Sequence, residues 1–172
     1  MNITRNRHFT YLALLSAMAI TLNLLETALI PPIMGVFRIG LANIIALLTL
    51  KILGRKDMIV VNLMRVIIGN LISGRFLGSS FWISLGGVLL STIILLIVDK
   101  MNSSLLFSSI LSSIGHSTGQ VLVVMAFYKQ AWMISFLPYF LLVSIPTGIF
   151  TGMIARVAID RVKPLRLDKK GK

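Results

Sequence analysis

Long apolar stretches separated by short polar segments run along most of this chain of 172 residues. Their lengths and spacing predict six helices, at about 9–30, 38–53, 57–74, 80–99, 105–127 and 134–158. Crossing the roughly 30 Å apolar core of a bilayer takes about 20 residues of helix. We therefore expect an all-α fold, an integral membrane bundle of six transmembrane helices. It forms a single membrane domain over residues 1–172 with a basic tail at 159–172.

One apolar stretch differs from the others because it carries a charge at its centre. Arg65 lies in the segment VVNLMRVIIGNLI. A guanidinium group in hydrocarbon costs at least about 2.5–3.5 kcal/mol unless something pairs with it. Two interpretations follow, and both stay open at this point. Arg65 belongs either to a buried polar site or to a structural pair, for which Glu26 is the candidate partner.

Composition and charge place the chain in the membrane class. Hydrophobic residues make up 56% of it, and the mean hydropathy is +0.93. In the predicted topology, 13 of its Lys and Arg residues lie in segments on the same side of the membrane as the two termini. Three lie in segments on the opposite side, and Arg65 lies within a predicted helix. The positive-inside rule then predicts cytoplasmic termini and a multi-pass protein of the cell membrane, the inner or plasma membrane of a prokaryote. We expect the basic tail to contact membrane lipids, and we expect no nucleic-acid partner.

The first predicted helix has two different faces. Ala13 and Ala17 are four residues apart, so they form a small-residue face on which another helix can pack closely. Asn23 and Glu26 lie on the opposite face in the other half of the helix. The small face serves either packing within the bundle or contact with a partner protein.

The fifth predicted helix combines a polar stripe with a glycine stripe. His116 and Gln120 are four residues apart and share one face, beside which lie Gly115 and Gly119. This pattern is typical of a helix that lines a cavity, and also of polar core residues that hold helices together. With two histidines and no cysteine in the chain, we expect no metal site and no disulfide.

Several polar residues are placed where the predicted helices reach the outer side. Arg38 and Arg75 near that surface would attract an anionic ligand toward Arg65. The short second helix leaves room for the loop before it to act as a lid. The candidate substrate-binding residues are Glu26, Arg38, Asn43, Arg65, Asn70, Arg75, His116 and Gln120.

The sequence offers little for catalysis. Its five acidic residues are scattered, so no carboxylate pair is placed to hold a magnesium–diphosphate group or to act as general acid and base. There is no Walker-type phosphate loop and no nucleophile motif. We expect no enzymatic activity and no cofactor.

Three segments together resemble a known family. RIGLANIIALLTLKILG at 38–54, the following helix with Arg65, and GHSTGQ at 115–120 resemble the Gx transporter family, also labelled heptaprenyl diphosphate synthase component I. That family is similar to the substrate-binding S components of energy-coupling factor (ECF) transporters. The resemblance covers roughly residues 8–158.

The resemblance implies a transport mechanism. An S component captures a vitamin-like micronutrient at the outer face, partly under the loop between its first two helices. A small-residue face on its first helix, here Ala13 and Ala17, docks on a membrane coupling (T) protein that two cytosolic ATPases drive. The ligand implied here is small and anionic or zwitterionic, either vitamin-like or an isoprenoid or quinone precursor.

The synthase label implies an alternative function. It suggests a noncatalytic membrane subunit associated with a prenyl diphosphate synthase. The aspartate-rich motifs that such chemistry uses are absent from this sequence.

Overall fold

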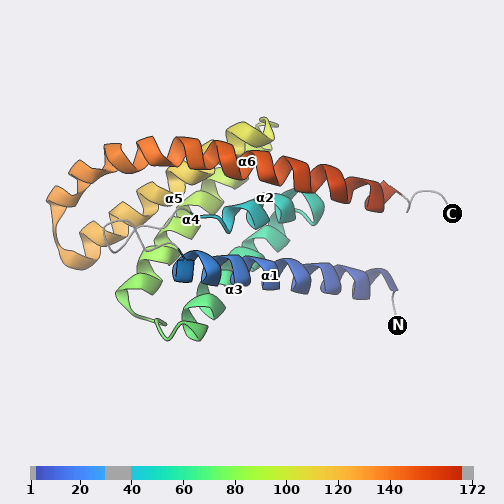
Figure 1. The fold of residues 1–172 in the computed structure, drawn as a ribbon, viewed down its shortest axis with the longest axis horizontal. Helices are drawn as coiled ribbons and strands as arrows, with labels where there is room; N and C mark the ends of the chain where they lie inside the picture. The colour runs from blue at the N-terminus through green and yellow to red at the C-terminus, as the bar shows by residue number, and fades with distance from the viewer. Residues whose placement is uncertain (1–2, 30–39, 168–172) are drawn as a thin grey trace.

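The computed structural model describes residues 3–29 and 40–167, and the side chains of 6–29 and 40–162. Within these ranges every regular element is a helix (Figure 1). The elements are α1 (Ile3–Leu29), α2 (Asn43–Ile52), α3 (Arg55–Ile72), α4 (Ser79–Lys100), α5 (Leu105–Tyr128), the 3₁₀ helix η1 (Ala131–Phe136) and α6 (Leu137–Leu167). The prediction of an all-α fold with six helices is confirmed.

Three predicted helix bounds differ from the structure. The first helix begins at Ile3, earlier than the predicted residue 9. The second helix begins at Asn43, not at residue 38, because residues 40–42 form a turn in which Gly40 has a φ of +83°. Only glycine adopts such a backbone conformation without strain. The last helix continues through the predicted start of the tail and ends at Leu167, and a 3₁₀ helix precedes it.

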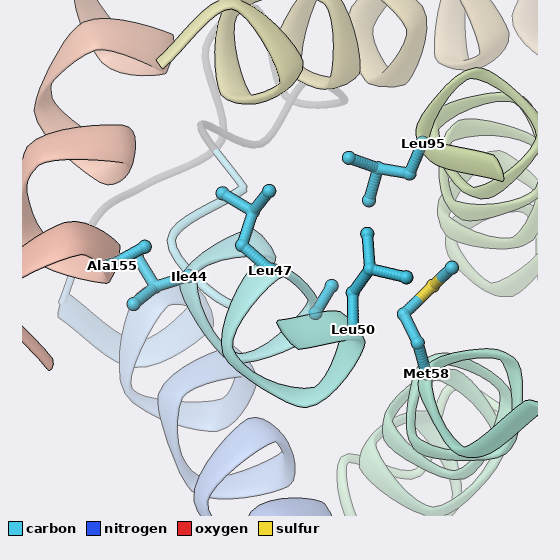
Figure 2. Close-up of a cluster of buried hydrophobic side chains, with 7 residues drawn as sticks. Ile44, Leu47, Leu50, Met58, Leu95 and Ala155 are labelled. Carbon is cyan, nitrogen blue, oxygen red and sulfur yellow. The ribbon is translucent and has the colours of Figure 1, made fainter. Parts of the chain in front are cut away.

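The short helix α2 lies at the centre of the bundle. Eight of its ten residues are buried, from Asn43 to Leu50. A helix that is apolar on every side is stable when other helices surround it. Figure 2 shows side chains of α2 meeting those of three other helices. The labelled members of this core are Ile44, Leu47 and Leu50 of α2, Met58 of α3, Leu95 of α4 and Ala155 of α6.

Helix α5 packs between α4 and α6 through glycines. A Cβ atom on Gly119 of α5 would collide with the backbone of Gly86 in α4, and one on Gly148 of α6 would lie 2.7 Å from Cα of Ile110 in α5. The helix backbones therefore approach each other more closely than side chains normally allow. This confirms close packing at the glycine stripe of the fifth predicted helix, and α6 contributes Gly148 to the same packing.

One end of the bundle is tied together by ion pairs. Asp99, near the end of α4, accepts hydrogen bonds from Lys51 Nζ and Arg55 Nε, both at 2.8 Å. His8 of α1 lies 3.2 Å from Asp57 of α3. Helix α1 begins and α6 ends at this same end (Figure 1). We call it the basic end.

Four helices are long and apolar enough to cross a membrane, at Asn6–Leu29, Ser79–Lys100, Leu105–Tyr128 and Ala131–Val162. These are the features of a membrane protein. Helix α2 is apolar but has only ten residues, and α3 carries Arg55, Lys56, Asp57 and Arg65. The crossing of all six helices and the cytoplasmic termini remain predictions.

Candidate functional site

Most of the predicted site residues are buried together in the interior. Glu26, Asn43, Arg65, Asn70, His116 and Gln120 each expose 5% or less of their surface. Arg75 is exposed in the turn between α3 and α4, where its backbone N–H donates to the carbonyl of Asn70. Arg38 lies outside the described residues, as does the loop predicted to act as a lid.

Glu26 of α1 holds the start of α2. Its Oε1 accepts a hydrogen bond from the backbone N–H of Gly40 at 2.6 Å, and its Oε2 accepts one from the N–H of Leu41 at 3.0 Å. Helix α2 has no side-chain cap of its own, because Ala42 stands at the capping position. A carboxylate near a helix N-terminus is stabilised by the amide groups there and by the helix dipole. Glu26 therefore anchors the turn that leads into α2, through amides that precede the helix.

Arg65 is buried with few partners. Its Nη2 donates to Oδ1 of Asn43, the first residue of α2, at 2.8 Å. Each of the three ion pairs among the described residues lies elsewhere, so Arg65 and Glu26 are not in salt-bridge contact. The two charges still attract each other, since both side chains line one cavity. A guanidinium group carries five N–H donors, and the described residues accept from one of them.

The cavity beside Arg65 is small and is lined by both polar and apolar residues. Its volume is about 10 Å³, and a single water molecule needs roughly 10–15 Å³. Its lining residues are Asn23, Glu26, Gly40, Ala42, Arg65, Val66, Ser84, Val88 and His116. The described structure is thus closed around Arg65, with room for about one water.

His116 and Gln120 lie where α5 meets α4. Their Nε2 atoms are 3.1 Å apart, and a Cβ atom on Gly87 of α4 would lie 2.9 Å from both Cε1 of His116 and Cγ of Gln120. His116 also lines the cavity, whereas Gln120 does not. Gln120 therefore contacts His116 without being part of the cavity wall.

Asn70 does not reach this cavity. Its Nδ2 donates to the carbonyl of Val66 at 2.7 Å, one turn back along α3. Closer to the basic end, α3 has another buried polar residue, Asn62. Its Nδ2 donates a hydrogen bond to Oγ1 of Thr92 at 2.8 Å. Asn62 Oδ1 is buried and has no hydrogen-bond partner among the described residues.

Two lining residues with polar side chains, Asn23 and Ser84, were not among the predicted site residues. Asn23 precedes Glu26 by three residues on one face of α1, so helical periodicity alone could have added it. It also lies against α3, because a Cβ atom on Gly69 would be 2.7 Å from Asn23 Nδ2. Ser84 of α4 gave no signal, since isolated serines are common in apolar helices.

The small-residue face of α1 points away from this cavity. Ala13 and Ala17 are exposed, whereas Leu15, Ala19 and Glu26 on the other side of α1 are buried. The two exposed alanines leave this part of α1 open to a neighbour.

No three His, Cys, Asp or Glu side chains converge on a metal-sized site in the part of the chain that the structure describes. The polar cluster around Arg65 is suited instead to hydrogen bonding and charge stabilisation.

A family model described as heptaprenyl diphosphate synthase component I matches residues 15–158. The match covers most of the chain, including α2 to α5 in full, so the chain belongs to that family. No curated protein and no solved structure matches it.

Proposed function

We propose that this member of the heptaprenyl diphosphate synthase component I family is the substrate-binding subunit of an importer of the energy-coupling factor type. It captures a small anionic or zwitterionic molecule at the end of the bundle opposite to the basic end. A vitamin-like compound or an isoprenoid or quinone precursor has this chemistry. The protein itself performs no reaction.

The burial of Arg65 is the observation that carries this proposal. The side chain is 3% exposed and bonds to Asn43 alone among the described residues. A buried cation with unused donors beside a small cavity is expensive for stability and suited to an anionic ligand. Glu26 and His116 line the same cavity, Asn43 accepts the hydrogen bond from Arg65, and Gln120 supports His116.

Ligand entry requires the closed cavity to expand. The Glu26 carboxylate holds the first residues after the undescribed segment 30–39, so releasing Gly40 and Leu41 would free the connection between α1 and α2. A ligand anion could then bind the same amides and Arg65. Arg38 and Arg75 would attract that anion from outside.

The exposed face of α1 fits the partner side of the proposal. Ala13 and Ala17 allow a membrane coupling protein to approach the helix backbone closely. Two cytosolic ATPases would supply the energy through that protein.

Ligand retention tests the proposal directly. The full-length protein would be purified from its own membranes and weighed by native mass spectrometry, with an adduct of a few hundred daltons expected. Arg65→Met should weaken retention at least about thirtyfold, because it removes a buried charged contact. Arg75→Met should produce a smaller, salt-dependent loss.

Two outcomes would reject this function. One is a well-folded protein that carries no small-molecule adduct. The other is an adduct retained equally by the wild type and Arg65→Met.

The family description favours a second candidate, a noncatalytic membrane subunit associated with a prenyl diphosphate synthase. Affinity purification of the tagged chain separates the two functions. Co-purification of a coupling protein and ATPases supports import, whereas co-purification of a soluble prenyl diphosphate synthase supports the second candidate.

A further inference from the structure

A larger cavity lies at the basic end, away from Arg65. Its volume is about 550 Å³, within the range of ordinary small-molecule sites. The end of α2, the start of α5 and the second half of α6 form its walls. Its lining residues are Lys51, Ser104, Leu105, Leu106, Gly152, Met153, Arg156, Ile159 and Asp160.

Arg156 provides an uncommitted positive charge in this cavity. The guanidinium group of Arg156 makes no hydrogen bond or ion pair with another described residue. The ammonium group of Lys51, in contrast, already bonds to Asp99. Ser104 Oγ accepts from the N–H of Phe107 and so caps α5 at the cavity wall. Asp160 lies one helix turn beyond Arg156 and can accept a hydrogen bond from a hydroxyl group.

An apolar hollow on α6 adjoins the cavity. That hollow has a volume of about 440 Å³ and is lined by Phe150, Met153, Ile154, Val157 and Ala158. Met153 lines both spaces, so they meet at its side chain. A single molecule placed across Met153 would have a charged group beside Arg156 and an apolar chain along α6.

We propose that this cavity and the adjoining hollow bind one anionic phospholipid, with its phosphate at Arg156 and Lys51 and an acyl chain along the hollow on α6. Helix α6 is apolar enough to lie in the membrane, so the chain need not leave hydrocarbon to occupy the hollow. The charged head group lies at the basic end, where lipid head groups meet the polar ends of the helices. This lipid site is separate from the proposed import site and does not depend on it.

Lipid selectivity provides the test. The full-length protein would be placed in nanodiscs of mixed phosphatidylglycerol and phosphatidylcholine, and the lipids it retains on release would be counted by native mass spectrometry. We expect the wild type to retain one phosphatidylglycerol in preference to phosphatidylcholine. Arg156→Gln should lower that occupancy about fivefold, because it removes the charge-assisted contact with the phosphate.

Two matched pairs of variants distinguish a specific phospholipid site from nonspecific attraction of anionic lipids to basic residues. Arg161→Gln removes an exposed arginine of α6 that does not line the cavity, and it should leave occupancy unchanged. Met153→Trp should block the junction between the two spaces, whereas Leu142→Trp adds the same bulk elsewhere on α6. Thermal denaturation of each variant checks that the fold is intact.

Three results would overturn the assignment. Equal losses in Arg156→Gln and Arg161→Gln would show nonspecific attraction. Retention unaffected by Met153→Trp would place the lipid elsewhere. Displacement of phosphatidylglycerol by farnesyl diphosphate, but not by farnesol, would assign the cavity to an isoprenoid diphosphate instead.

Discussion

Oε1 of Glu26 in α1 lies 2.6 Å from the backbone nitrogen of Gly40, just before α2. This is one of two backbone amides that donate hydrogen bonds to the Glu26 carboxylate; the other is that of Leu41. Glu26 and Arg65 line the same cavity without forming an ion pair. The carboxylate thus supports the backbone of one helix and also balances the charge of another.

Glu26→Gln should destabilise the protein by about 2–4 kcal/mol. The amide can accept from one backbone N–H, but its NH₂ group faces the other donor, and Arg65 loses its neighbouring negative charge. Thermal denaturation in detergent measures the effect. Asp160→Asn, which changes an exposed carboxylate without a described partner, is the control and should stay within about 0.5 kcal/mol. Equal melting temperatures for both variants would contradict this role of Glu26.

The double variant Glu26→Gln/Arg65→Met should be less destabilised than the sum of its single variants. Removing Glu26 alone leaves a buried cation without compensation, and removing Arg65 as well takes that cost away. We expect a coupling energy of roughly 1–3 kcal/mol in a double-mutant cycle. Additive effects would mean that the two charges act independently despite the shared cavity.

Gly119→Ala should destabilise the contact between α4 and α5 by about 1–3 kcal/mol or more. The added methyl group meets the backbone of Gly86 and lies 3.0 Å from Cα of Gly87, and neither can rotate away. Gly78→Ala is the matched control, since its Cβ would meet only the carbonyl of Arg75 at 3.3 Å. Comparable stability of the two variants would show that the helices separate easily.

Ala13→Leu/Ala17→Leu should abolish uptake while leaving ligand retention within about twofold of wild type. Both side chains are exposed on α1, on the face away from Glu26, so added bulk would hinder a partner without touching the cavity. Ala28→Leu makes the same change at an exposed position in the other half of α1 and should leave both measurements unchanged. Joint loss of uptake and retention in a folded double variant would refute the separation of the two faces.

The sequence predicted the helices well because long apolar stretches specify them directly. It also brought Glu26, Arg65 and His116 into one candidate site, and the structure places all three on one cavity. It did not reveal that Glu26 binds backbone amides, because that contact joins segments that helical periodicity does not relate. Arg75 was expected at the site because its position in the sequence places it near the outer surface. It is exposed in a turn, and position along the chain does not reveal the direction of a side chain in a turn.

The length of α2 has a consequence for the chain as a membrane protein. Ten residues span about 15 Å, half of a bilayer core, so α2 is too short to cross the core by itself. A peptide group that lies in hydrocarbon cannot turn to water for its hydrogen bonds. The Glu26 carboxylate supplies hydrogen bonds to the amides of Gly40 and Leu41 in place of solvent, and so it allows the turn before this short helix to be buried.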